Sequence, residues 1–282
     1  LLNTTGTATV SGVISGLGSL RVNGLGGNMV LAGANTFSGG VLLDAGTLRS
    51  DHDSALGIGT LTIGDATLTS NASRALGNDL VVSQATSTLA AAAGVDFSFS
   101  GTLTGGTGDI LNLVNTSGTG TMSVGFNNAA LVFNRGLDLG ANTELRLTNT
   151  SGTQTLSAAI TGSGSIVRNG TGGETTISAA NTGYSGTTQI QAGTLTVGNN
   201  DALGTGTTAL AGGTLNITAD RTLANDLNLS ASSTLSGGAG DDLIFSSSNI
   251  TTSAGTLTLS NTAGSGTMSA GFTGSGFDFT RS

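Results

Sequence analysis

Residues 59–69 read Gly-Thr-Leu-Thr-Ile-Gly-Asp-Ala-Thr-Leu-Thr, two short runs of alternating polar and apolar residues separated by Gly-Asp. Alternation with a period of two is typical of half-buried strands, so Leu61 and Ile63 are expected to point inward and Thr60 and Thr62 outward. Gly, Asn and Asp recur roughly every five to ten residues and mark turns. No segment carries a sustained 3.6-residue apolar stripe. The sequence therefore predicts an all-β protein of short strands and tight turns.

A long internal repeat organises the chain. Residues 74–80, Arg-Ala-Leu-Gly-Asn-Asp-Leu, return at 221–227 as Arg-Thr-Leu-Ala-Asn-Asp-Leu, 147 residues further on. Self-similarity at a fixed period is the signature of stacked architectures. We divide the chain into two copies of one unit, 1–146 and 147–282, of which the second is the shorter. We expect the chain to be a window cut from a longer array of such units.

Composition selects among the all-β architectures. Aromatic residues make up 4% of the chain, which is low for a β-sandwich core about 10 Å thick. Small apolar side chains suit the narrow interior of a β-helix, where every stacked strand must donate ladder hydrogen bonds, and the chain has no Pro. A sandwich or a propeller fits less well. We predict a β-solenoid with coils of roughly 20–25 residues.

Charge and composition also exclude several kinds of partner. The chain has 282 residues, a net charge of −8, no Lys, and eight Arg that are scattered singly, which argues against nucleic acid. No apolar stretch approaches the ~20 residues needed to span a bilayer. The absence of Cys excludes disulfides and thiolate metal sites. Apolar residues make up 37% and the mean hydropathy is +0.20, so the chain can fold despite having only 9% charged residues.

A sixteen-residue stretch, Gly33–Leu48 (GANTFSGGVLLDAGTL), resembles the passenger-associated repeat of bacterial autotransporters. The second copy carries Ala-Asn-Thr-Gly-Tyr-Ser-Gly at 180–186 and Ala-Gly-Thr-Leu-Thr-Val at 192–197. The resemblance implies an extracellular, right-handed parallel β-helix on the surface of a Gram-negative bacterium. It implies no activity, because passengers with this repeat serve as stalks, adhesins and scaffolds. We expect Asn35 and Asn181, at equivalent places, to bridge backbone groups across a coil corner.

His52, the one histidine, lies between Asp51 and Asp53 and invites a metal or acid–base interpretation. The second copy has Gly-Asn-Asn at 198–200, so that chemistry would be missing from half of the units. Asn and Asp are common in turns, and we predict a polar turn.

Residues Gly237–Phe245 fit the calcium-binding nonapeptide G-G-x-G-x-D-x-U-x at every fixed position. Calcium in such rolls lies between consecutive nonapeptides, and no second copy follows. The partial match at Gly105–Asp109 has no counterpart in the other copy. We predict plain Gly-Asp turns, with no metal and no cofactor.

Catalysis is not expected from the acidic residues. A glycan lyase or hydrolase needs two carboxylates about 5–10 Å apart, whereas most of the 14 Asp lie in turn contexts. The two Glu are Glu144 and Glu174. Asp79 and Asp226 share an Asn-Asp-Leu setting, as expected of a corner residue. We assign no catalytic, cofactor-binding or metal-binding residue and predict that the chain is not an enzyme.

The sequence favours an extracellular structural or adhesive repeat segment of a large secreted bacterial surface protein. One alternative is a passive stalk for a binding head elsewhere. Another is an ice-binding or surface-binding face, suggested by Thr-x-Thr at 60–62, 67–69 and 194–196. The expected partners are neighbouring copies of the repeat, end to end, and a host or abiotic surface. Neither residues 1–14 nor residues 270–282 resemble a polar cap, so end-to-end stacking into a fibre is expected.

Overall fold

The computed structural model describes residues 1–84, 86–106, 108–246 and 249–260, and the backbone alone at 261, 269–271 and 279–281. It is all-β, and its strands pair in parallel and stack as a β-solenoid, which confirms the predicted fold class. No helix in the described ranges is long and apolar enough to cross a membrane. The expectation of an uncapped end at 270–282 lies largely outside the described residues.

The chain forms two compact units, Leu1–Glu144 (unit 1) and Leu145–Ser282 (unit 2). This division is made on contacts in space, whereas the repeat boundary between residues 146 and 147 is drawn on sequence similarity. The repeat boundary therefore stays a prediction.

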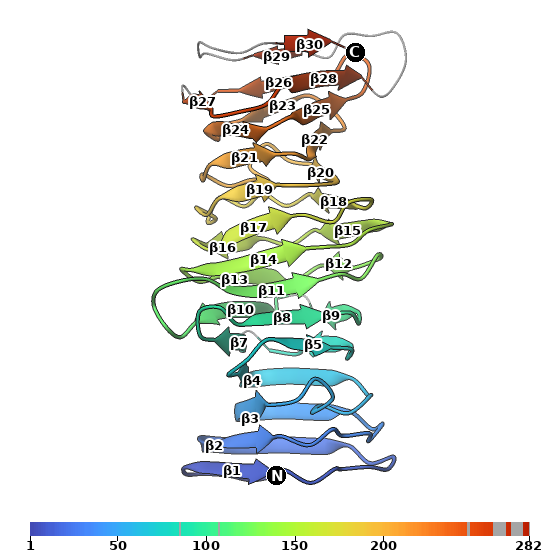
Figure 1. Ribbon diagram of the computed structural model, residues 1–282, viewed down its shortest axis with the longest axis vertical. Coiled ribbons are helices and arrows are strands. Elements are labelled where there is room, and N and C mark those ends of the chain that lie inside the picture. Colours follow the sequence, from blue (N-terminus) through green and yellow to red (C-terminus); the bar gives the residue numbers. More distant parts are fainter. Residues whose placement is uncertain (85, 107, 247–248, 262–268, 272–278, 282) are drawn as a thin grey trace. The chain divides into compact units, whose positions relative to one another are not determined.

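In unit 1, a short first strand is followed by three long strands, β2 to β4, and then by shorter ones (Figure 1). Their bounds are β1 (Thr7–Val10), β2 (Leu20–Leu31), β3 (Val41–Ser50), β4 (Leu61–Ser70), β5 (Arg74–Leu76), β6 (Leu80–Val82), β7 (Ser87–Ala91), β8 (Asp96–Phe99), β9 (Leu103–Gly105), β10 (Ile110–Asn115), β11 (Met122–Phe126), β12 (Val132–Phe133) and β13 (Gly136–Leu139). One sheet has the order β1-β2-β3-β4-β7-β10-β13, with β6 paired to β4 and β9 to β6, and another has the order β5-β8-β11. The next strand, β14 (Thr143–Leu147), runs across the unit boundary.

Unit 2 consists of shorter strands throughout. Their bounds are β15 (Thr153–Leu156), β16 (Ile160–Gly162), β17 (Ser165–Arg168), β18 (Glu174–Ile177), β19 (Thr188–Ile190), β20 (Thr194–Val197), β21 (Thr208–Ala211), β22 (Thr214–Ile217), β23 (Arg221–Leu223), β24 (Leu227–Ala231), β25 (Ser233–Gly237), β26 (Asp242–Phe245), β27 (Ile250–Thr252), β28 (Leu257–Asn261), β29 (Ser269–Gly271) and β30 (Phe279–Arg281). Its sheets have the orders β15-β18-β20-β22-β25-β28-β30, β17-β19-β21-β24-β27 and β23-β26-β29.

The register gives the length of each coil. Thr194 of β20 pairs with Thr214 of β22, 20 residues on. Leu111 of β10 pairs with Leu137 of β13, 26 residues on. The expected coil length of roughly 20–25 residues therefore holds in unit 2 at this ladder and is slightly exceeded in the later part of unit 1.

The alternation that opened the sequence analysis is present in β4. Leu61 and Ile63 are fully buried, Thr62 is half-buried and Thr60 is exposed. Since successive side chains of a strand point to opposite faces, the apolar residues of each coil fill the interior. Fully burying one such side chain stabilises the fold by about 1.5–3 kcal/mol.

The cores of the two units are filled differently. In unit 2, Leu195 and Leu215, both buried, are direct partners on β20 and β22. In unit 1, four phenylalanines make a row of neighbouring rings with centroids 6.3, 5.6 and 5.4 Å apart, namely Phe97, Phe99, Phe126 and Phe133. This row of rings lies in the later part of unit 1, where coils of 26 residues occur.

Candidate functional site

The amide of Asn35 joins three successive coils of unit 1. Its Oδ1 accepts a hydrogen bond from the Ile14 N–H at 2.8 Å, and its Nδ2 donates to the Ala55 carbonyl at 2.7 Å. Asn35 is 1% exposed. Buried backbone groups need hydrogen-bond partners, so this one side chain satisfies a donor one coil before it and an acceptor one coil after it.

Asn181 makes the same two bonds in unit 2. Its Oδ1 accepts from the Ile160 N–H at 2.8 Å, and its Nδ2 donates to the Ala202 carbonyl at 2.6 Å. The expectation that both asparagines bridge backbone groups is confirmed. We call these contacts of Asn35 and Asn181 the asparagine bridges.

The aromatic residue of the motif packs against a glycine of the next coil. Phe37 and Tyr184 are buried. Gly57 has φ +68°, and a Cβ there would lie 2.4 Å from the Phe37 carbonyl oxygen. Gly204 has φ +62°, and its Cβ would lie 2.1 Å from the Tyr184 carbonyl oxygen. The left-handed backbone and the close approach both require glycine, which explains why Ala-Leu at 55–56 and at 202–203 is followed by Gly in each copy.

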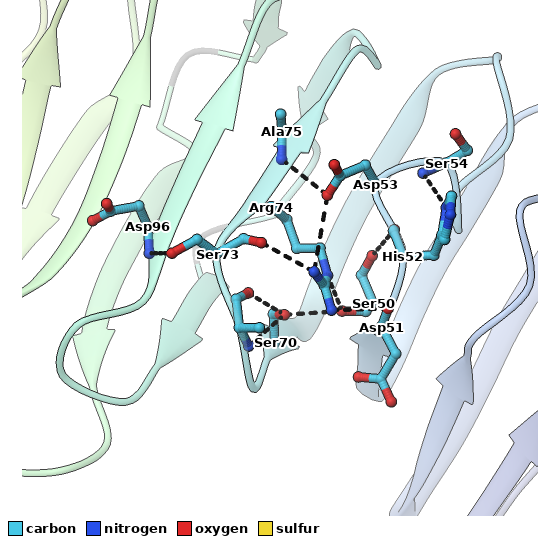
Figure 2. Close-up of polar contacts among 11 residues, drawn as sticks. Ser50, Asp51, His52, Asp53, Ser54, Ser70, Ser73, Arg74, Ala75 and Asp96 are labelled. Carbon is cyan, nitrogen blue, oxygen red and sulfur yellow. Dashed lines mark hydrogen bonds and ion pairs between the residues drawn. The ribbon is translucent and has the colours of Figure 1, made fainter.

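His52 makes a local turn (Figure 2). Its Nδ1 accepts a hydrogen bond from the Ser54 N–H at 3.0 Å, so this bond assigns the proton of the neutral ring to Nε2. At the equivalent place in unit 2, Asn199 Oδ1 accepts from the Asp201 N–H at 2.9 Å. Imidazole and amide therefore perform the same task, that of a turn acceptor.

Arg74 fastens the same corner to the preceding coil (Figure 2). Its Nε donates to the Ser50 carbonyl at 3.2 Å, and its Nη2 donates to the Asp51 carbonyl at 2.8 Å. Its Nη1 donates to the Ser73 carbonyl at 3.0 Å and lies 3.9 Å from Asp53 Oδ1. The guanidinium thus binds three backbone carbonyls, two of them on the preceding coil.

Arg221 repeats this arrangement in unit 2. It donates to the carbonyls of Val197 at 3.4 Å, Gly198 at 2.9 Å and Asp220 at 2.8 Å. Each position is 147 residues from its unit 1 counterpart. The sequence analysis did not predict that these arginines bind backbone carbonyls of the preceding coil. The signal that could have indicated it was the Arg that begins both repeated segments, 74–80 and 221–227.

The nonapeptide-like segment holds its own aspartate within a turn. Asp241 Oδ2 accepts from the Gly238 N–H at 2.7 Å, and Gly240 has φ +89°. The partial match in unit 1 is built alike, with Asp109 Oδ2 accepting from the Gly106 N–H at 2.6 Å. Within the described ranges, no group of three or more His, Asp or Glu residues is placed to hold a metal ion.

The corner aspartates accept hydrogen bonds from the next coil. Asp79 Oδ1 accepts from the Thr102 hydroxyl at 2.7 Å and from its N–H at 2.6 Å. The Thr102 hydroxyl above all, and then the backbone N–H, lower the pKa of Asp79, because both favour the charged form. Asp226 accepts from Asn249 Nδ2 at 3.5 Å. These carboxylates are corner groups that join coils.

The outward side chains of one sheet in unit 2 form two columns of small polar residues. The first column holds Thr153, Glu174, Thr194, Thr214, Thr234 and Thr258. The second column holds Thr155, Thr176, Thr196, Asn216, Ser236 and Ser260. We call these twelve residues the threonine face.

Hydrogen bonds within the second column, and one from it to the first, occupy several of its polar groups. Asn216 Nδ2 donates to Thr196 Oγ1 at 3.1 Å, the Ser236 hydroxyl donates to Asn216 Oδ1 at 2.5 Å, and the Thr196 hydroxyl donates to Glu174. Thr196 and Ser236 are also buried. The half-buried threonines of the first column are therefore the more accessible part of the face.

In unit 1, one threonine of the Thr-x-Thr segments, Thr67, lies in a polar column of the same kind, with Thr7, Asn28, Thr47, Thr88 and Asn112. Thr60-Leu61-Thr62 and Thr67-Leu68-Thr69 lie in the same coil rather than one above the other. The partners of Thr69 are Arg49 and Ala90, which interrupt the row. Of the three segments, Thr194-Leu195-Thr196 alone belongs to the threonine face.

Comparison with known proteins gives one informative similarity. The chain is 32% identical over 112 residues to the "Adhesin BmaC autotransporter" of Brucella suis biovar 1 (strain 1330), which covers 35% of this chain and 3% of that protein. No family model and no solved structure matches the chain. The chain thus spans only a small part of the length of that relative. At the level of a passenger-like β-solenoid, the chain is similar to an autotransporter adhesin.

Proposed function

We propose that the chain is an extracellular structural and adhesive segment of a bacterial surface protein. One observation carries this proposal: polar side chains in both units hydrogen-bond to neighbouring coils, as the asparagine bridges and the guanidinium groups of Arg74 and Arg221 do. Such side chains hold neighbouring coils together, as suits a rigid structural segment. The similarity to an adhesin agrees with this role.

The first column of the threonine face is the proposed adhesive surface. Thr194, Thr214 and Thr234 follow one another at intervals of 20 residues, and partners on neighbouring strands lie about 4.8 Å apart. A regular row of hydroxyl groups suits a polar surface such as a glycan layer or a hydrated solid, because each hydroxyl group can both donate and accept a hydrogen bond.

Beads coated with the 282-residue chain test the adhesive role on host-cell and abiotic surfaces. Lysines at Thr194, Thr214 and Thr234 are expected to reduce binding several-fold, since they replace the hydroxyl groups with bulky charges. The matched control places three lysines at exposed threonines of unit 2 outside the threonine face, Thr171, Thr182 and Thr222, and should leave binding unchanged. Coated beads that bind no better than bare ones would instead favour a passive stalk.

End-to-end association of the isolated chain is a second proposal. Among the described strands, β1 is paired only to β2, which leaves one edge of β1 with unpaired N–H and C=O groups. Leu2 and Leu17, near this edge in sequence, are 76% and 89% exposed. An open strand edge with apolar neighbours favours head-to-tail contacts, which do not close into a ring.

Sedimentation velocity and electron microscopy at micromolar concentration test this association. Filaments or stacked particles are expected. Lysines at Thr7 and Thr9 on β1 should suppress them, because charge on an edge strand opposes pairing. A monodisperse monomer at every concentration would contradict the proposal.

A further inference from the structure

A cavity of about 380 Å³ lies in unit 1 between β9 and the segment that contains β12. Its lining combines apolar and polar side chains, among them Thr102, Thr104, Leu131, Val132, Asn134 and Arg135. This volume falls at the lower end of the range for small-molecule sites, which are mostly apolar with a few polar groups.

Arg135 is the unusual member of this lining. It is 2% exposed, and its Nη2 donates to Asn134 Oδ1 at 2.6 Å. Its Nε and Nη1 are buried and have no hydrogen-bond acceptor among the described residues. Burial lowers the pKa of the guanidinium, and the charge of Asp109 opposes that effect. A buried donor without a partner costs about 1–3 kcal/mol, and more when it is charged.

The other fully buried arginine shows how this fold satisfies a guanidinium. Arg168 is 0% exposed and donates through Nη1 to the Leu147 carbonyl at 2.9 Å. Its Nη2 reaches the carbonyls of Asn149, at 3.3 Å, and of Gly173, and its Nε reaches that of Thr194 at 3.3 Å. Backbone carbonyls therefore accept hydrogen bonds from all three nitrogens of the Arg168 guanidinium, and the role of this side chain is structural. Arg135 lacks this set of acceptors.

The backbone beside Arg135 leaves room for the guanidinium. A Cβ on Gly105 would lie 2.0 Å from Arg135 Nη1 and 2.3 Å from the Val82 carbonyl oxygen. The side chain thus rests against a bare glycine, next to the cavity that it helps to line. A small rotation of the guanidinium away from Gly105 would turn its unpartnered N–H groups toward a ligand in the cavity.

We propose that this cavity binds a small organic carboxylate of the size of one acidic sugar, with Arg135 holding the carboxylate. Arginine is the side chain best suited to carboxylates, through charge-assisted hydrogen bonds. The Thr104 hydroxyl and Asn134 Nδ2 can bond to sugar hydroxyls, while Leu131 and Val132 offer apolar contact. A bare inorganic anion would leave most of the volume unfilled. The site goes beyond the structural and adhesive role and does not depend on it.

Titration of the 282-residue chain with glucuronate, glucose and acetate tests the proposal by calorimetry and by the Nε–Hε resonance of Arg135. Glucuronate is expected to bind and to shift this resonance. Glucose, which matches it in size but has no charge, and acetate, which carries the charge without the ring, should each bind at least about tenfold more weakly. No glucuronate binding up to about 10 mM, or equal binding of glucose or acetate, would overturn the proposal.

Two variants locate the site. Arg135→Met should weaken glucuronate binding at least about tenfold, while Arg21→Met, which removes an exposed guanidinium, should leave it unchanged. Arg135→Met changes a buried residue, so a second variant, Ala130→Trp, tests the location of the ligand independently. Ala130 is exposed and lines the cavity, and a larger side chain there fills the cavity without disturbing the core. Binding that survives Ala130→Trp in a folded protein would place the ligand elsewhere and contradict the proposal.

Discussion

The later coils of unit 1 and the middle coils of unit 2 are both built from ladders of parallel strands, but their interiors differ. Leu111 and Leu137 in unit 1 are 26 residues apart, whereas Thr194 and Thr214 in unit 2 are 20 apart. The longer coils enclose the row of phenylalanines, the cavity and an unsatisfied arginine, and the shorter coils enclose stacked aliphatic side chains. The shorter coils also bury single rings, Phe37 and Tyr184, whereas the row of rings and the ligand-sized cavity occur in the longer coils.

Replacing Phe126, in the long coils of unit 1, is expected to have the largest effect on stability. Phe126→Ala should lower the free energy of unfolding by about 3–5 kcal/mol, because it removes a buried ring that contacts Phe99 and Phe133. The matched change in the short coils, Leu215→Ala, should cost about 2–5 kcal/mol. Urea unfolding of both variants measures the difference. A cost below ~1 kcal/mol at Phe126 would mean that the long coils are not close-packed.

The asparagine bridges should contribute equally to the free energy of unfolding in both units. Asn181→Leu leaves the Ile160 N–H and the Ala202 carbonyl buried without partners and should cost about 2–4 kcal/mol. Asn35→Leu should cost a similar amount. Thr182→Ala, at the exposed neighbouring position, serves as the control and should change stability by less than about 0.5 kcal/mol. A near-neutral Asn181→Leu would show that water replaces the bridge.

The turn at His52 should be interchangeable between the units. His52→Asn copies Asn199 of unit 2 and is expected to leave the melting temperature unchanged, whereas His52→Ala removes the acceptor for the Ser54 N–H. The loss is expected to be about 0.5–1 kcal/mol, since the site is exposed and water can substitute. If His52→Asn were as harmful as His52→Ala, the imidazole would have a role beyond the turn.

Chelation should have no effect on stability. Asp241 and Asp109 each accept a backbone N–H of their own turn, so we expect EDTA to leave the melting temperature unchanged. A drop of more than ~5 °C would indicate bound calcium at Gly237–Phe245 or at another site.

Local pattern was enough to predict the fold and part of the site. The alternation in β4 and the paired positions of Asn35 and Asn181 carry their structural meaning in the residues themselves, because strand periodicity and turn chemistry are local. The environment of each arginine cannot be predicted from its neighbours in the sequence. Arg168 aligns with buried Val22 of the first copy, and the carbonyls that surround Arg168 come from residues on three different coils. The threonine face likewise depends on coil lengths that set which residues become partners.

The register of unit 2 tests the central claim most directly, because the face, the bridges and the coil length all depend on it. Spin labels at positions 194 and 214 should show strong dipolar broadening, since their backbones lie about 4.8 Å apart on neighbouring strands. Labels at 194 and 234, two strands apart, should couple more weakly. Equal coupling in the two pairs, or none in the first, would contradict a parallel solenoid with 20-residue coils.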